Sequence, residues 1–212
     1  MRAAVVLITD PAYGDEAIVR CVEAAGRALP PGALCVQLRD RRRPLISLRV
    51  FASRLRGVTR ALEASLVVNG DARVARDVGA DGVHLARGAG SVADARSAFG
   101  RPAWVSVAAH SDDDVRQALG EGADAVLVSP IFPTRSPAPL AVAKEPRGLA
   151  ALRAARAVAP AGLQIYALGG VTPDRAPDCL AAGADGVAVI RALLDSAEPA
   201  GVARRLYAAF LA

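Results

Sequence analysis

Short apolar runs alternate along this chain with longer stretches in which apolar residues recur at helical spacing. In the stretch 15–28, for example, Ile18, Val22 and Ala25 fall on one face of a helix. The apolar runs show little polar alternation, which is typical of strands that are buried on both faces. The predicted strands are 3–9, 34–39, 66–69, 82–85, 104–109, 125–129, 164–168 and 186–190.

Each predicted strand is followed by a predicted helix, which favours a parallel sheet with helical crossovers. These α/β units predict a closed (β/α)₈ TIM barrel, and no linker or shift in composition divides residues 1–212 into more than one domain. The rival fold is an open doubly wound sheet, which the lack of Gly-x-Gly-x-x-Gly after the first strand disfavours. The predicted helices are 15–28, 44–63, 71–78, 91–99, 111–119, 147–158, 172–183 and 198–210.

The phrase Gly-Ala-Asp precedes three of the predicted strands. It begins at Gly79, Gly122 and Gly183, each time between a helix and a strand. In each copy we expect the glycine to end the helix and the aspartate to tie the turn that leads into the strand. The repetition supports a parallel sheet built from similar units.

The stretch 166–190 reads as a strand, a glycine turn, a helix and a strand. Gly169 and Gly170 let the backbone turn sharply and approach a ligand closely. Backbone N–H groups at such a turn attract a phosphate, and Ile190 and Arg191 end the neighbouring strand on the other side of the expected site. The alternative is a tight turn without a ligand.

Polar residues at the carboxyl ends of the predicted strands are candidate site residues. Enzymes built on such a barrel place the active site at those ends. The candidates are Thr9, Asp10, Gln37, Arg39, Asn69, His84, His110, Ser129, Gly169, Gly170 and Arg191.

These candidates suit different roles. His110 follows the fifth strand and can move protons near neutral pH; the alternative is a partly buried histidine bonded to a loop carbonyl. His84 lies within a very short strand, which favours a structural role. Arg39 ends an apolar strand, where an arginine is expected to bind an anion. Asn69 either makes a turn or contacts a ligand.

Composition narrows the functional classes. The net charge is +5, but the basic residues are dispersed and aromatic residues make up only 4%, so we expect no nucleic-acid partner. No apolar run is long enough for a membrane span. Cys21, Cys35 and Cys179 are scattered and odd in number, which predicts a cytoplasmic protein without a disulfide or zinc framework. The proline-rich segment 130–146 is expected to be a functional loop or a mobile one.

Several short motifs, each weak alone, together match one family. They are 7–10 (LITD), 37–39 (QLR), 68–69 (VN), 79–85 (GADGVHL), 110–111 (HS), 130–134 (PIFPT), 168–174 (LGGVTPD) and 182–189 (AGADGVAV). On these residues the chain resembles thiamin phosphate synthase and the related TenI-type thiazole tautomerase. The resemblance covers nearly the whole chain and implies a small (β/α)₈ barrel.

The synthase of this family joins a pyrimidine diphosphate to a thiazole phosphate with Mg²⁺. The resemblance implies an aspartate at each of two positions where this chain has Gly70 and Ala89. Asp71 lies one position too late, although it could partly compensate. The motif that carries a diphosphate-binding lysine reads Thr-Arg-Ser-Pro at 134–137, so that lysine is missing too. Because Mg²⁺ prefers carboxylate and phosphate oxygens, we expect no protein metal site.

The tautomerase branch resembles a metal-free isomerase that moves a proton on a thiazole carboxylate phosphate. The resemblance implies that His110 is its acid and base. It also implies substrate contacts at Gln37, Arg39, Asn69 and Thr134, and phosphate contacts at Gly169, Gly170 and Ile190. Arg191 stands where the family has a small residue, so it either adds a phosphate contact, as we expect, or crowds the site.

Three functions therefore stay open. The main expectation is a metal-independent tautomerase with no cofactor. The alternatives are the synthase, which would need Mg²⁺, and a non-catalytic regulatory barrel that binds a phosphorylated ligand. In each case the expected partner is a small phosphorylated thiazole-type molecule, and whether the chain forms a homo-oligomer is left open.

Overall fold

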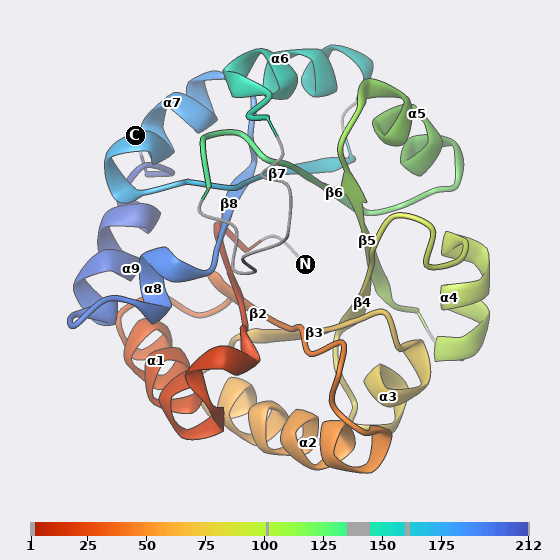
Figure 1. The fold of residues 1–212 in the computed structure, drawn as a ribbon, viewed down its shortest axis with the longest axis vertical. Helices are drawn as coiled ribbons and strands as arrows, with labels where there is room; N and C mark the ends of the chain where they lie inside the picture. Colours follow the sequence, from red (N-terminus) through yellow and green to blue (C-terminus); the bar gives the residue numbers. More distant parts are fainter. Residues whose placement is uncertain (1–2, 101, 135–144, 160–161, 212) are drawn as a thin grey trace.

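A closed barrel of parallel strands forms the centre of the computed structural model, which describes residues 3–100, 102–134, 145–159 and 162–211 (Figure 1). Each strand pairs with the next one along the chain, and β8 pairs with β1 to close the ring. The predicted (β/α)₈ fold is thereby confirmed. The strands are β1 Val5–Ile8, β2 Leu34–Leu38, β3 Ser65–Asn69, β4 Gly82–Leu85, β5 Trp104–Ala109, β6 Ala125–Val128, β7 Gln164–Leu168 and β8 Gly186–Val189.

A ring of helices covers the outside of the barrel (Figure 1). Three features differ from the sequence-based expectation. A 3₁₀ turn, η1, precedes the first predicted helix. A short helix, α8, follows β8 at once, and the predicted helix 172–183 is divided into a 3₁₀ turn, η2, and α7. The helical segments are η1 Pro11–Tyr13, α1 Asp15–Arg27, α2 Leu45–Ala61, α3 Ala72–Asp77, α4 Val92–Phe99, α5 Asp112–Gly120, α6 Gly148–Val158, η2 Pro173–Arg175, α7 Ala176–Ala181, α8 Arg191–Leu194 and α9 Pro199–Ala208.

The strands are buried on both faces, as their apolar runs predicted. In β1, Val5 packs in the cluster under the helices, whereas Val6 packs in the cluster inside the barrel. The ring of Tyr166 fills part of that interior, and a Cβ atom at Gly186 would lie 2.5 Å from its Cε1 atom. The inside of the barrel is therefore a packed core, and a site is expected at the carboxyl ends of the strands.

The three Gly-Ala-Asp copies lie at the amino ends of β4, β6 and β8 and build one repeated contact, which we call the carboxylate clamp. The Oδ2 atom of Asp185 accepts a hydrogen bond from the N–H of Ile165 in β7 at 2.8 Å and pairs with Arg156 of α6. Each clamp thus joins a turn to the preceding strand and to the helix before that strand. The other two clamps are Asp81 with Leu66 and Arg56, and Asp124 with Val105 and Arg96.

Two expectations drawn from composition can be compared with the described residues. Cys21, Cys35 and Cys179 are free and buried. None of the described helices is long and apolar enough to cross a membrane.

Candidate functional site

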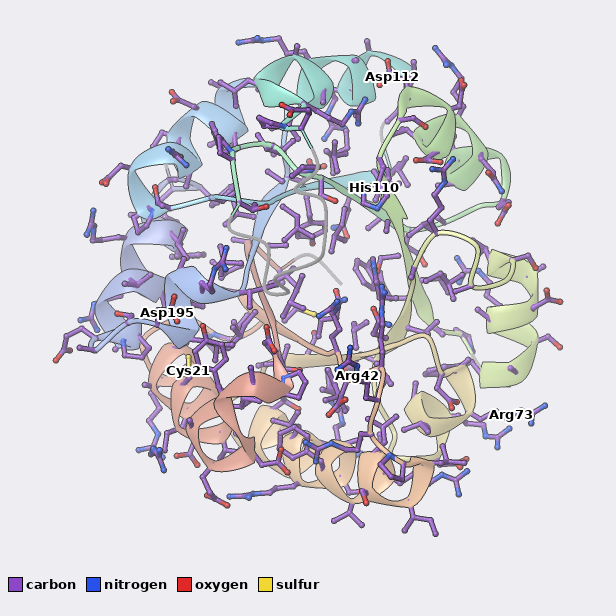
Figure 2. The ribbon with its side chains drawn as sticks, viewed as in Figure 1. Cys21, Arg42, Arg73, His110, Asp112 and Asp195 are labelled. Atoms are coloured by element: carbon purple, nitrogen blue, oxygen red, sulfur yellow. The ribbon has the colours of Figure 1, made fainter. Side chains whose placement is uncertain are left out.

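The carboxyl ends of the strands bring most of the predicted site residues to one end of the barrel, here called the mouth. Figure 2 shows His110 on the inner side of the ring, whereas Asp112, only two residues later, lies at its edge between α5 and α6. Thr134 is half-buried and is the last described residue before 135–144, so most of the predicted loop 130–146 lies outside the described residues. The residues brought to the mouth are Gln37, Arg39, Asn69, His84, His110, Ser129, Gly169, Gly170, Ile190 and Arg191.

The imidazole of His110 is oriented by Ser129, which directly follows β6. The Nδ1 atom of His110 lies 2.9 Å from the carbonyl oxygen of Ser129 and 3.2 Å from its Oγ atom. A carbonyl oxygen only accepts hydrogen bonds, so Nδ1 carries the proton in the neutral ring and Nε2 keeps its lone pair. The loop-carbonyl contact that the sequence offered as a structural alternative is therefore present, and it leaves Nε2 able to act as a base.

Asp114 holds the backbone beneath this imidazole. Its Oδ2 atom accepts the N–H of His110 at 2.7 Å, and its Oδ1 atom lies 3.4 Å from Nε of Arg87. Burial by itself would raise the pKa of Asp114, but the hydrogen bonds from His110 and Ser111, with the Arg87 charge, lower it. The sequence analysis did not select Asp114, although its spacing from the N-cap Ser111 is that of a capping box.

Four neutral polar side chains line the barrel just below the mouth, and we call them the polar floor. The Nε2 atom of Gln37 donates to Oδ1 of Asn69 at 3.4 Å, and Nδ1 of His84 lies 2.9 Å from Oγ of Ser106. In the sheet, Asn69 lies beside His84, and His84 lies beside Ser106. Burial, and then the charges of nearby cations, lowers the pKa of His84 to about 3, so the floor carries no charge at neutral pH.

Arg39 supplies a cation beside this floor. Its backbone N–H donates to Oγ1 of Thr9 at 2.9 Å, which fixes the end of β2. Its guanidinium group is half-buried and makes no ion pair or hydrogen bond with any described side chain. Burial lowers the pKa of Arg39, and the adjacent Arg41 acts in the same direction. The charges of Asp10 and Asp40 oppose this shift without forming an ion pair with Arg39. A partly desolvated cation that no described carboxylate pairs directly is suited to an anionic group of a ligand.

The glycine turn after β7 packs closely against the start of the β6 loop. A Cβ atom at Gly170, where φ is +63°, would lie 2.6 Å from the carbonyl oxygen of Pro133. A Cβ atom at Gly169, where φ is +101°, would lie 2.9 Å from Cα of Pro130. The N–H of Phe132 also donates to the carbonyl oxygen of Gly169 at 2.9 Å. These glycines are therefore required by the packing of the loop, a reason that the sequence alone did not reveal.

The same turn has unused donors. Within the described residues, neither the N–H of Gly170 nor that of Ile190 makes a backbone hydrogen bond, and α8 begins after Ile190 without a side-chain cap.

The Tyr13 hydroxyl forms a hydrogen bond with Asp195 and so joins the loop after β1 to the segment after α8. Burial, followed by this bond, raises the pKa of Tyr13 to about 12, which keeps its hydroxyl protonated. No local motif marked Tyr13 or Asp195 in the sequence.

The sequence of this chain is similar to those of known proteins. A family model described as thiamine monophosphate synthase matches residues 5–193. A thiamine-phosphate synthase of Moorella thermoacetica is 38% identical over 87% of this chain and 86% of its own length. A putative thiamine-phosphate synthase of Geobacter sulfurreducens is 35% identical over 95% and 92%. The chain belongs to the thiamine monophosphate synthase family.

A solved structure agrees with this family assignment. Thiamine phosphate pyrophosphorylase from Pyrococcus furiosus superposes with a TM-score of 0.85 and 25% sequence identity, covering 99% of this chain and 96% of the other. The arrangement of strands and helices described above is thus shared with that protein.

The residues of this family member do not fit a magnesium site like the one that the resemblance implied. Gly70 and Ala89 have no carboxylate, although a Cβ atom at Gly70 would meet nothing within 4 Å. Oδ1 of Asp71 accepts the N–H groups of Arg73 at 3.0 Å and Val74 at 2.9 Å as the N-cap of α3, so this carboxylate is directed to the start of that helix. Within the described ranges, no group of three or more His, Cys, Asp or Glu residues could hold a metal ion. Mg²⁺ favours carboxylate oxygens, and the polar floor offers amides, a hydroxyl and an imidazole instead.

Proposed function

We propose that this member of the thiamine monophosphate synthase family is a metal-independent thiazole tautomerase. Its substrate would be a thiazole carboxylate phosphate, and its reaction would move one proton so that the ring becomes aromatic. The observation that carries the proposal is an oriented, half-buried His110 in a mouth whose two expected metal positions are Gly70 and Ala89. Isomerisation needs the first feature and no metal, whereas the synthase chemistry relies on a metal site.

The proposed binding mode divides the ligand among three groups. The phosphate would bind the free N–H groups near Gly170 and Ile190, because such donors at a helix start favour anions. The carboxylate would pair with Arg39. The middle of the ligand would then lie near β5, within reach of His110.

Proton transfer in this arrangement needs only one side chain. The Nε2 atom of His110 would take a proton from one ring position and return it to another, so the substrate and product differ only in that proton and the double bonds. Histidine is suited to this exchange because its reference pKa of about 6.5 allows it both to accept and to donate near neutral pH.

The second candidate is thiamin phosphate synthase itself. The names of the relatives from Moorella thermoacetica and Geobacter sulfurreducens support it. In that case the chain would couple a pyrimidine diphosphate to a thiazole phosphate, and any metal would be bound mainly by the diphosphate oxygens. The third candidate, a non-catalytic barrel that binds a phosphorylated ligand, needs only the proposed contacts with the phosphate and carboxylate groups at the mouth.

One experiment separates the three candidates. The purified chain is stripped with EDTA and given a thiazole carboxylate phosphate, or a pyrimidine diphosphate plus a thiazole phosphate, with and without Mg²⁺. We expect metal-independent isomerisation and no thiamin phosphate. Thiamin phosphate formed only with Mg²⁺ would establish the synthase, and ligand binding without either product would establish the non-catalytic barrel. Calorimetry should also show no micromolar Mg²⁺ binding to the ligand-free protein.

A further inference from the structure

The helices α4 and α5 begin with the same pattern of residues. Each has a serine as its N-cap and an aspartate at the third helical position, and the serine hydroxyl accepts the N–H of that aspartate. The pairs are Ser91 with Asp94 in α4, and Ser111 with Asp114 in α5. They allow a comparison between an ordinary helix cap and the cap that directly follows His110.

The aspartate of α5 makes a contact that capping does not require. In α4, Asp94 is exposed, and its Oδ2 atom accepts the hydroxyl of Ser91 at 2.8 Å. In α5, Asp114 is only 9% exposed, and its Oδ2 atom accepts the N–H of His110, the residue before the cap, at 2.7 Å. A capping box requires a bond to the N-cap residue itself, so the bond to His110 is an addition.

This additional bond fixes His110 relative to its ring partner. The backbone of Ser129 is held at the end of β5, because its N–H donates to the carbonyl oxygen of Ala109 at 3.0 Å. Asp114 holds the backbone of the next residue, His110, and the Nδ1 atom of His110 then lies 2.9 Å from the carbonyl oxygen of Ser129. Because such bonds are lost beyond about 3.2 Å, a backbone shift of about half an ångström would break the Nδ1 contact.

We propose that Asp114 is a positioning residue whose bond to the N–H of His110 sets the direction in which the imidazole enters the mouth. Without that bond the chain between β5 and α5 relaxes, and Nδ1 leaves the carbonyl oxygen of Ser129. Displacing a reacting group by about 1 Å costs about 10²-fold in rate. The inference rests on the proposed function for the reaction that is measured, but the state of the imidazole ring is measured independently of turnover.

Three substitutions separate positioning from capping. Asp114→Ala removes the acceptor of the His110 N–H. Asp114→Asn keeps an oxygen at that place but removes the charge that faces Arg87, whose Nε atom lies 3.4 Å from Oδ1. Asp94→Ala is the matched control, because it removes the aspartate of the same kind of cap from α4. Circular dichroism and thermal unfolding check each fold, and Asp114→Ser, whose hydroxyl is too short to reach His110, replaces Asp114→Ala if that variant does not fold.

Steady-state kinetics and nitrogen NMR spectroscopy then test the inference. We expect Asp114→Ala to lower kcat about 10–100-fold and to leave KM within about twofold, because the proposed phosphate and carboxylate contacts remain. In alkaline buffer the His110 ring, assigned by comparison with His110→Ala, should change from the Nδ1–H tautomer to a mixture of both tautomers. A cap that is only structural would lower the unfolding temperature and move neither quantity. Asp114→Asn and Asp94→Ala should retain the tautomer, and kcat within about threefold.

Other outcomes overturn the inference. They are an unchanged kcat or an unchanged tautomer in Asp114→Ala, and a loss of equal size in Asp94→Ala or in Asp114→Asn. If the tautomer changes as expected but the original chain shows no isomerase activity, the proposed function fails while the positioning of His110 by Asp114 stands.

Discussion

The two ends of the barrel use polar residues in opposite ways. At the amino ends of the strands, each carboxylate clamp pairs an aspartate with both a backbone N–H and an arginine. At the mouth, several polar groups have no partner among the described residues, namely the guanidinium of Arg39, the Nε2 atom of His84 and the N–H groups of Gly170 and Ile190.

This difference separates stability from function. Buried or partly buried polar groups that are paired stabilise the fold, whereas the same groups left unpaired cost free energy unless a ligand pairs them. The repeated Gly-Ala-Asp phrase is the most visible pattern in the sequence, yet it lies at the end of the barrel that is remote from the strand carboxyl termini. The non-repeated residues at the mouth are those available for chemistry.

The largest expected effect comes from His110. His110→Ala should lower the rate of isomerisation by about 10²–10⁴-fold, because general acid–base catalysis is typically worth that factor. Folding and inorganic phosphate affinity should stay near those of the original chain, since neither depends on the Nε2 atom. Steady-state kinetics and calorimetry provide the measurements. Full activity in a well-folded His110→Ala protein would show that another group is the base.

A second test uses the response of stability to acid. The folded-state pKa of His84 is about 3, lowered mainly by burial, whereas the unfolded value is about 6.5. Between these values the unfolded chain binds one more proton, so stability falls on acidification by up to about 1.4 kcal/mol per pH unit. Denaturant titrations at several pH values should show this slope in the original chain and a shallower one in His84→Gln. Equal slopes would mean that His84 is not held neutral at the mouth.

The two ends of the barrel can also be compared through one glycine substitution made at each end. Gly170 at the mouth and Gly122 in a clamp turn both have positive φ, +63° and +74°, but only Gly170 has atoms where a side chain would go. Gly122→Ala should cost about 1–2 kcal/mol from backbone strain alone. Gly170→Ala should cost about 2–4 kcal/mol and weaken phosphate binding, because the loop at Pro133 must move. Equal costs in denaturant titrations would argue against close packing at the mouth.

The smallest effect is expected at the clamps. Asp185→Ala leaves the N–H of Ile165 without its acceptor, which should cost about 1–2 kcal/mol of unfolding free energy. The partner Arg156 is partly exposed, so the lost ion pair should add little. Activity per folded molecule should not change. A clamp variant that loses activity while remaining folded would contradict the assignment of stability to the amino ends of the strands and of function to the mouth.

Much of the fold could be predicted from the sequence because its signals are local and consistent. Apolar runs bounded by glycine and polar caps placed β4, β5 and β7 at their observed bounds. The four-residue α8 has too little periodicity to be recognised, and the 3₁₀ turn η2 interrupts a pattern that reads as one helix.

The site was predicted less completely, because its contacts join residues far apart in the chain. The position of His110 after a strand was enough to select it, but the tie between Tyr13 and Asp195 spans nearly the whole sequence. For Gly170 the sequence suggested a ligand, whereas the close neighbour is the loop residue Pro133. The contact between His84 and Ser106 likewise joins two strands, and residue type alone does not show it.

The pairing of β8 with β1 has a consequence for synthesis on the ribosome. Val5 lies beside Val187, so the free edge of β1 is covered only when β8, made much later along the chain, has emerged. Until then a nascent chain exposes unpaired backbone groups on β1 and on the most recently made strand, and such edges are prone to pair with other chains. Because closure joins residues so distant in sequence, it is a slow, non-local step, and the edge of β1 is protected from aggregation only after β8 has been made.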